Sequence, residues 1–181
     1  MAGRRANAGL KATASSMRRF RKPKPLTPED AQDPARARLA AISLLARRDY
    51  ASGELQLKLE SRGYPPEPIA AAVAEMVGDG IVNDARYAEN YVSYHAGRGE
   101  GPLRIEAELR ELKISSEIID AALKGGPDWR ARAREIRIRR FGAEVPDSWA
   151  AKAKQGRFLQ YRGFSSDHIR AALGPDFDPN E

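Results

Sequence analysis

The residue types that most often carry out catalysis are few in this 181-residue chain, and its sequence does not group them. The two histidines, His95 and His168, are 73 positions apart, and His95 continues an apolar helical stripe, as a core residue does. Glu106 and Glu108 lie on a polar helix face, whereas a general acid needs burial to raise its pKa. A phosphate-binding Gly-Lys-Ser or Gly-Lys-Thr loop is missing from the sequence. We therefore predict a protein that is not an enzyme, with no catalytic residue, cofactor or metal site.

Cysteine content and hydropathy limit where the protein works. The chain has no cysteine, which excludes disulfides and thiolate metal sites and fits a reducing compartment. No apolar run approaches the roughly 18 residues of a membrane-spanning helix. We expect a soluble, cytoplasmic protein without a membrane partner.

Positive charge is concentrated at the N-terminus. Residues 1–28 hold eight lysines or arginines and no acid, so the remainder carries 23 basic and 25 acidic side chains. This segment lacks apolar periodicity and ends in Pro23, Pro25 and Pro28, so we predict a disordered basic tail over residues 1–33. Such an arm adds salt-sensitive contacts with phosphates, although its composition is also that of an organelle transit peptide. Both interpretations stay open.

A second basic region covers residues 125–173, which contain eleven basic and five acidic side chains. One interpretation is a patch that binds a polyanion or an acidic partner surface, and the other is a solvated helix face. The acidic segment 174–181 would offset part of this patch. The residues that we predict to contact a partner are Arg47, Arg48, Arg130, Arg134, Arg137, Arg140, Lys152, Lys154, Arg157 and Arg162.

A pattern that repeats every 50 residues determines how these side chains are positioned. Leu59, Gly63 and Tyr64 recur as Leu109, Lys113 and Ile114, and again as Leu159, Gly163 and Phe164. A leucine near a helix end, a left-handed glycine after the helix and an apolar residue that folds back onto the leucine describe a glycine C-cap. Lys113 fits least well, because a left-handed conformation costs a non-glycine residue about 1 kcal/mol. A fixed period of this size indicates stacked supersecondary units.

Helical stripes lie on both sides of each turn. After the first turn, Ile69, Ala72, Val73 and Met76 stand at i, i+3, i+4 and i+7, which marks one face of a helix. The core stripes that we assign to the leading helices are Leu39, Ile42, Leu45 and Ala46, then Ala88, Tyr91, Val92 and His95, then Trp129, Ala133 and Ile136. We predict an all-α fold in which three tandem three-helix units, 34–83, 84–124 and 125–173, form an elongated, curved helical array of nine helices. A short acidic tail at 174–181 follows.

Two helices joined by a glycine turn also suggest a helix-turn-helix DNA reader, which points the N-terminus of its second helix at the major groove. Here those N-termini carry Glu67, Glu117 and Asp167. Acids at these positions complement the helix dipole but would face the DNA phosphates. Groove reading in this mode is therefore disfavoured.

Several spaced motifs occur in one order along residues 34–173. They are Ala46, Arg47, Arg48, Ser52, Glu54, Leu55, Leu59, Arg62 and Gly63, then Asp84, Ala85, Arg86, Tyr87 and Ala88, then Gly101, Pro102, Ile105 and Leu109, and finally Phe158, Leu159, Arg162, Gly163, Phe164, Ile169 and Ala172. In combination this order resembles the RecX family of bacterial regulatory proteins. The sequence departs from the family at Asn83, at Lys113 and in its longer basic tail.

The resemblance implies three tandem three-helix units that bind the groove of the RecA filament on single-stranded DNA and inhibit ATP hydrolysis and strand exchange. It also implies roles in DNA repair, DNA recombination and the SOS response, and weak, salt-sensitive binding of single- or double-stranded DNA. We expect a monomer. The alternative is a DNA-binding helical protein that acts independently of RecA, and a helical scaffold for another partner is a third possibility.

Overall fold

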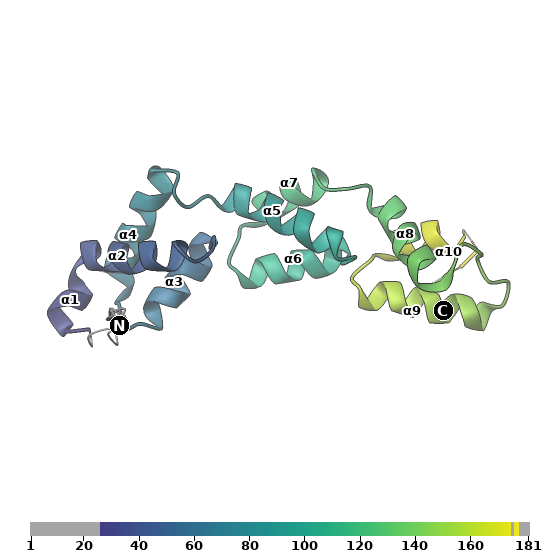
Figure 1. Cartoon of the computed structure of the whole chain (residues 1–181), viewed down its shortest axis with the longest axis horizontal. Coiled ribbons are helices and arrows are strands. Elements are labelled where there is room, and N and C mark those ends of the chain that lie inside the picture. The colour runs from purple at the N-terminus through teal and green to yellow at the C-terminus, as the bar shows by residue number, and fades with distance from the viewer. Residues whose placement is uncertain (1–25, 175, 178–181) are drawn as a thin grey trace, which may run out of the picture.

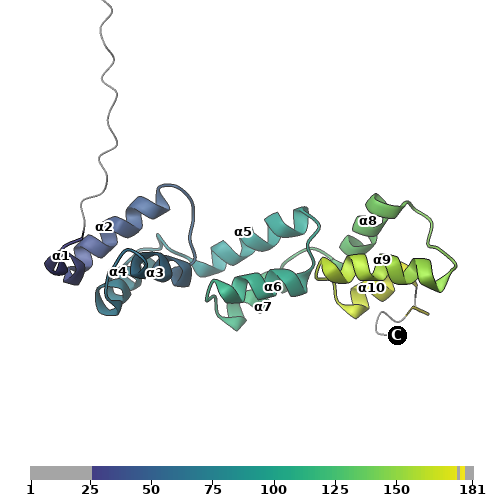
Figure 2. The same ribbon diagram turned by 90° about the horizontal axis from the view of Figure 1, so that it is seen from below.

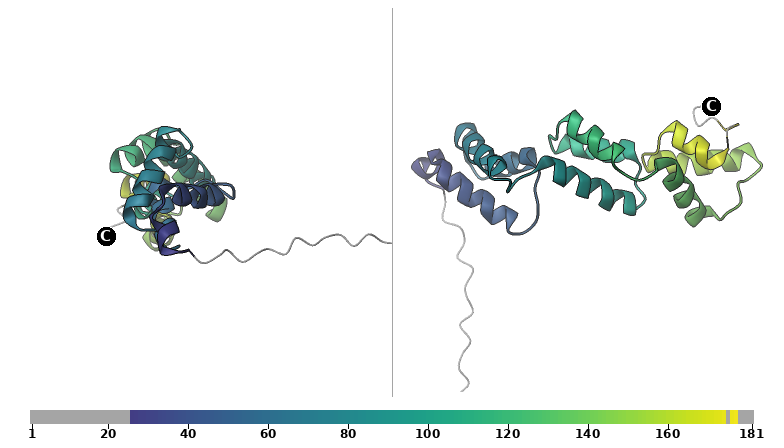
Figure 3. Two further views of the ribbon diagram at one scale, coloured as in Figure 1. Left: turned by 90° about the vertical axis from the view of Figure 1, so that its left-hand side faces the viewer. Right: turned by 90° about the horizontal axis from the view of Figure 1, so that it is seen from above.

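The computed structural model describes residues 26–174, 176 and 177, and within them the chain forms ten helices and no strand. The helices follow one another along a single long axis, so the molecule is elongated in Figure 1 and narrow when viewed end-on in Figure 3. No helix in this part of the chain is long and apolar enough to cross a membrane. The prediction of an all-α helical array is confirmed.

Nine of the helices form three consecutive triplets, in each of which the first helix packs on the third and the second completes the group. The first triplet is α2 (Pro34–Leu45), α3 (Ser52–Glu60) and α4 (Pro66–Gly78). The second is α5 (Asp84–Gly97), α6 (Pro102–Glu111) and α7 (Ser116–Lys124). The third is α8 (Trp129–Phe141), α9 (Trp149–Tyr161) and α10 (Ser166–Leu173). Figure 2 shows the second helix of the second and third triplets, α6 and α9, in front of α7 and α10.

The tenth helix, α1 (Pro28–Gln32), lies inside the segment that we expected to be disordered. Thr27 Oγ1 accepts a hydrogen bond from Asp30 N at 3.1 Å, and Pro28 occupies the first helical turn, where its missing N–H has no cost. Ala31 is buried, and α1 contacts α2 and α4. The prediction of disorder is therefore wrong at residues 28–32, while residues 1–25 lie outside the described part of the chain.

Each triplet has its own hydrophobic core, centred on Leu55 and Leu59, on Ile105 and Leu109, and on Leu159 with Phe164. The stripe that we assigned to α2 is wrong at Leu39 and Ile42, which are 61% and 39% exposed, whereas Leu45 packs against the core as expected. Ala37, Ala41 and Leu44 are buried instead. The helix is apolar on two sides, and its alanine side allows α2 to approach α4 closely.

The core of the third triplet extends beyond the helix that ends it. Phe177 is buried against this core, and a Cβ atom at Gly156 of α9 would lie 2.7 Å from the Phe177 ring. The segment that we called an acidic tail therefore contributes a core side chain, and the third unit continues past residue 173.

The three predicted caps have the expected geometry. Gly63, Lys113 and Gly163 have φ values of 93°, 63° and 88°. The amides that follow donate to the leucine carbonyls, Tyr64 N to Leu59 O at 3.3 Å, Ile114 N to Leu109 O at 3.3 Å and Phe164 N to Leu159 O at 3.1 Å. The turn at Lys113 makes the same backbone hydrogen bond as the turns at the two glycines, so the cap is undistorted. The free-energy cost of lysine there comes from its left-handed backbone conformation.

Neighbouring triplets meet where the start of the second helix of one triplet contacts the turn that follows the second helix of the next triplet. Gly101 N donates to Arg162 O at 2.7 Å and Leu103 N donates to Gly163 O at 3.0 Å, so the start of α6 is bonded to the turn after α9. At the other junction, Ser52 N and Oγ donate to the Asp84 carboxylate at 2.7 and 2.5 Å. Ala51 is buried in the core of the second triplet. Backbone hydrogen bonds and one capping carboxylate thus orient each triplet on the next.

We expect Gly163→Ala to destabilise the protein more than Gly63→Ala does. Both replacements place a side chain at positive φ, at a cost of about 1–2 kcal/mol. At Gly163 the new Cβ would also lie 2.7 Å from Arg104 N, which adds about 1–3 kcal/mol of overpacking. At Gly63 the nearest atom is Leu26 Cδ2 at 3.7 Å. Urea unfolding measures both variants, and equal losses of stability would contradict the proposed backbone junction.

Candidate functional site

The ten predicted contact residues separate into internal supports and solvent-facing cations. Arg137 is a clear correction, since its side chain is 1% exposed. It donates from Nη2 to Ala143 O at 2.8 Å and from Nη1 to Glu144 O at 2.9 Å, which ties α8 to the loop before α9. Burial lowers the pKa of Arg137. This residue supports the third unit from inside and is not available to a partner.

Arg162 and Arg48 are also held by intramolecular contacts. Arg162 Nη1 donates to Arg98 O at 3.2 Å, and its guanidinium lies 5.2 Å from the Phe158 ring, at the junction of the second and third triplets. Arg48 pairs with both oxygens of Glu54 at 2.5 and 3.0 Å and stacks on Tyr50, and the Glu54 hydrogen bond raises its pKa. Arg47 beside it is exposed and forms no ion pair with a residue that the structure describes.

The outer face of α9 carries basic side chains next to an exposed aromatic ring. Lys154, Arg157 and Tyr161 stand at i, i+3 and i+7, so they follow one side of the helix, and we call them the α9 strip. Lys154 and Arg157 are exposed and have no ion-pair partner among the described residues. Tyr161 is 85% exposed, although tyrosine is usually packed at such a position. The strip can therefore offer two cations and one flat ring to a polyanion or an acidic protein surface.

The remaining candidates flank this strip. Arg130 and Arg140 are exposed at the two ends of α8, Lys152 is half-buried on α9, and Arg134 donates from Nη2 to Ala171 O at 3.2 Å. Arg132, which we did not nominate, donates to Ala96 O at 2.9 Å and to Gly97 O at 2.8 Å, so it caps the end of α5. Its function depends on a tertiary contact between two triplets, which a single helical pattern does not contain.

The third helix of each triplet, which follows the cap turn, carries the predicted carboxylate in its first turn, Glu67 in α4, Glu117 in α7 and Asp167 in α10. Hydrogen bonds from the backbone and from Ser115 hold the pKa of Glu117 below its usual value, and the bond to Arg170 does the same for Asp167. His168 is half-buried and forms a capping box with Ser165 at the start of α10. Burial, with Arg130 nearby, lowers the pKa of His168.

Within residues 26–174, 176 and 177, one group of side chains could offer three ligand atoms to a metal ion, namely His95, Glu100 and Glu108. His95 Nδ1 lies 2.7 Å from Glu100 Oε2 and 3.7 Å from Glu108 Oε2. Arg104 Nε donates to Glu108 Oε1 at 3.0 Å, and Tyr91 Oη donates to Glu108 Oε2 at 3.0 Å. Arg104 and Tyr91 thus bond to both oxygens of Glu108, and His95 Nδ1 lies at hydrogen-bond distance from Glu100, so the cluster forms a side-chain network that joins α5 to α6.

Family models and related proteins match most of the chain. The family models for the first, second and third three-helix domains of RecX match residues 37–76, 83–123 and 128–173. The chain is 43% identical over 137 residues to regulatory protein RecX of Pseudomonas fluorescens, covering 75% of this chain and 88% of the relative. It is 43% identical over 146 residues to regulatory protein RecX of Halorhodospira halophila, covering 78% and 89%.

Two solved structures share the fold. A crystal structure of RecX from Lactobacillus salivarius gives a TM-score of 0.69 at 22% identity, covering 81% of this chain and 96% of that one. A second crystal structure of a regulatory protein RecX gives a TM-score of 0.67 at 23% identity, covering 80% and 73%. At these identities the match supports the arrangement of helices and nothing finer.

We expect Arg137→Ala to destabilise the third triplet by about 2–4 kcal/mol, because it leaves a cavity and removes two partly buried hydrogen bonds. Arg140→Ala, on the same helix, should change stability by less than about 0.5 kcal/mol because the side chain is exposed. Thermal unfolding monitored by circular dichroism compares the two. If Arg137→Ala were as stable as Arg140→Ala, the assignment of Arg137 as an internal support would be wrong.

Proposed function

The chain belongs to the RecX family, and on that premise we propose that it is a negative regulator of RecA, the recombinase that polymerises on single-stranded DNA. It binds the RecA filament along its helical groove and inhibits ATP hydrolysis and strand exchange. By this activity it affects DNA repair, recombination and the SOS response. The protein does this without chemistry of its own, as a binding protein.

The observation that carries this proposal is the agreement between three consecutive family domains and an array whose cations lie on its exterior. A helix of 13 residues, such as α9, is about 20 Å long, so three triplets in line present an extended surface. A filament presents the same subunit surface many times, and an elongated array can contact more than one copy. Affinity then comes from dispersed contacts, which fits side chains that are not gathered into a catalytic site.

We assign the contact with the filament to exposed candidate cations whose charged groups form no hydrogen bond or ion pair with another described residue. These are Arg47 near the end of the first triplet, Arg130 and Arg140 on α8, and Lys154 and Arg157 of the α9 strip. They can pair with acidic side chains of RecA or with phosphates of the DNA that it coats. Arg48, Arg134 and Arg162 contribute indirectly, since their guanidinium groups are engaged within the array.

Sub-stoichiometric amounts of the protein should lower the single-stranded-DNA-dependent ATPase of RecA. The double variant Lys154→Glu with Arg157→Glu should raise the concentration needed for half-inhibition by roughly tenfold, because two exposed attractive charges become repulsive. A matched control, Lys58→Glu with Lys124→Glu, makes the same charge change at exposed sites on α3 and α7. Equal inhibition by both double variants would remove the α9 strip from the interface. An unchanged RecA ATPase with folded parent protein would remove the proposed function.

Direct DNA binding without RecA is the second candidate, and the α9 strip favours it because an aromatic ring beside cations can stack on a base. Deletion of residues 1–25, which hold eight basic side chains and end before the cap of α1, separates the two candidates. We expect the deletion to weaken binding to naked DNA at low salt while RecA inhibition survives. Filter binding at several salt concentrations and the ATPase assay measure the two effects. Loss of inhibition in proportion to DNA affinity would favour the DNA-binding protein.

A further inference from the structure

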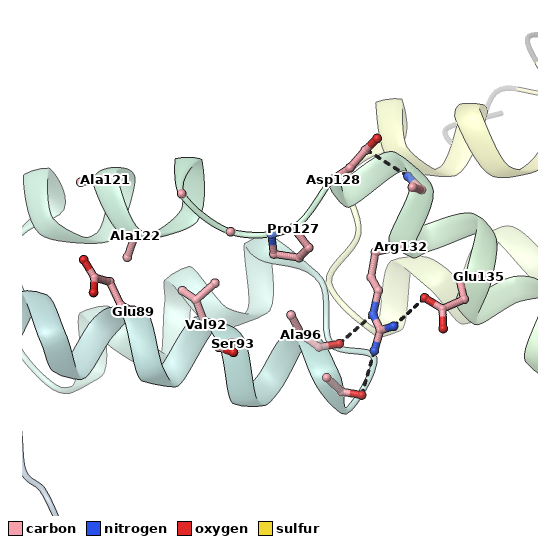
Figure 4. Close-up of a pocket in the computed structure, with 14 residues that line it drawn as sticks. Glu89, Val92, Ser93, Ala96, Ala121, Ala122, Pro127, Asp128, Arg132 and Glu135 are labelled. Carbon is pink, nitrogen blue, oxygen red and sulfur yellow. Dashed lines mark hydrogen bonds and ion pairs between the residues drawn. The ribbon is translucent and has the colours of Figure 1, made fainter.

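A hollow in the surface lies where the second and third triplets meet. It is a cleft of about 1010 Å³ between α5, α7 and the start of α8. Figure 4 shows Val92 and Ala96 rising from α5 toward Ala122 on α7, with Pro127 in the connection that closes one side. Small side chains and Gly125 and Gly126 line much of the wall, so a bulky apolar group of a ligand could approach the backbone closely.

The rim of this cleft is acidic. Glu89, Asp128 and Glu135 line it, and Arg132 is its single lining cation. The Arg132 guanidinium is already used, because it donates to Ala96 O and Gly97 O and pairs with Glu135 Oε2 at 2.6 Å. The cleft therefore has an excess of negative charge, and it repels phosphates.

The two rim carboxylates that belong to α8, Asp128 at its N-cap and Glu135 within the helix, remain ionised at neutral pH. The hydrogen bond from Arg132 holds the pKa of Glu135 below its usual value. Asp128 caps α8 by accepting from Arg130 N at 2.9 Å and Ala131 N at 3.1 Å, and those backbone bonds lower its pKa. Glu89 on α5 is exposed and forms no ion pair with a described residue. A ligand that matches this cleft carries apolar groups and several positive charges.

Residues 1–25 of this chain have that chemistry. They contain no acid, and they place Leu10, Met17 and Phe20 among eight basic residues, Arg4, Arg5, Lys11, Arg18, Arg19, Arg21, Lys22 and Lys24. Phe20 stands directly between Arg19 and Arg21, so an apolar ring could enter the cleft while its neighbours pair with the rim. The matched family domains begin at residue 37, so this segment is additional to the regulatory array.

We propose that the cleft binds the basic N-terminal segment, residues 1–25, of a second copy of the chain. Reach favours a second copy. The segment joins the array at α1, which packs on the first triplet, whereas the cleft is lined by residues from the middle and end of α5 in the second triplet. α2, about 18 Å long, and much of α5, a helix about 21 Å long, lie one after the other along the array between these two points (Figure 1). A random-coil chain of 25 residues has a root-mean-square span of about 25–30 Å, so reaching its own cleft demands a conformation more extended than the average, whereas reaching the cleft of a second copy does not.

The contact is head-to-tail, because the surface that donates differs from the surface that accepts. Contacts of this type do not close on themselves and continue into open chains unless the rotation forms a ring. The bound segment also withdraws its positive charges from phosphates. Self-association would therefore compete with the salt-sensitive DNA contacts of the same segment, which is a property distinct from RecA inhibition.

Paramagnetic relaxation in the full chain tests the proposal, and the absence of native cysteine allows a single nitroxide label at Ser16→Cys. Spin-labelled protein at natural isotope abundance is mixed with ¹⁵N-enriched protein that carries no spin label, so only contacts between copies broaden the observed signals. We expect broadening of the amides of Ser93, Ala121 and Ala131 in the cleft, and no broadening at Gln56 on α3. Unaffected cleft amides would overturn the proposal. Broadening confined to a diluted, doubly labelled sample would show that the segment reaches its own cleft and would also overturn it.

A charge variant supplies the matched control. Glu89→Lys in the ¹⁵N protein should weaken the association by about two- to fivefold, since one exposed attraction becomes a repulsion. Glu111→Lys makes the same change on an exposed position of α6, in the same triplet but outside the cleft, and should leave the broadening unchanged. Equal effects of the two variants would mean that the segment senses only overall charge, and the cleft would not be its site.

Discussion

The array depends on close contact between the backbone of one triplet and the backbone of the next. At the second junction the turn at Gly163 lies on the start of α6, where a Cβ atom at Gly101 would be 2.5 Å from Phe164 N. Side chains are excluded there, and hydrogen bonds from Gly101 N and Leu103 N replace them. At the first junction the turn carries Lys113, and the glycine is found across the contact at Gly53, whose Cβ would lie 2.8 Å from Leu112 O. The small residue can thus be supplied by either partner of the contact.

This constraint explains which parts of the fold could be predicted from the sequence. The turns at Gly63, Lys113 and Gly163 were predictable because a C-cap is local, with the leucine, the left-handed residue and the apolar residue all within six positions. The leading helix of the first triplet was not, because α2 has apolar residues on two faces. Only the position of α4 decides that Ala37 and Ala41, and not Leu39 and Ile42, face the core. Phe177 was missed for a similar reason, as it follows the last periodic element and packs against Gly156.

The candidate site was less predictable than the fold, because a count of arginines does not reveal what each guanidinium contacts. Arg137 donates to backbone carbonyls of a loop, Arg132 caps a helix of the preceding triplet, and Arg162 reaches Arg98 O across a junction. No pattern within α8 or α9 contains these partners. The α9 strip was accessible to sequence reasoning at Lys154 and Arg157, while the exposure of Tyr161 was not, since tyrosine at the end of a helix usually packs.

The arrangement of charge separates two kinds of contact along one molecule. Exposed cations without an ion pair lie on the outer faces of α8 and α9. The acidic cleft lies between triplets, where the Arg132 guanidinium donates its hydrogen bonds to backbone carbonyls. An anionic partner is attracted to the first surface and repelled by the second, so the two can be occupied together without competing for the same side chains. The N-terminal segment is the element that both could influence, because its cations fit phosphates as well as the cleft. Raising salt weakens both attractions, but burial of an apolar ring in the cleft would persist, and that difference lets self-association outlast DNA binding as ionic strength increases.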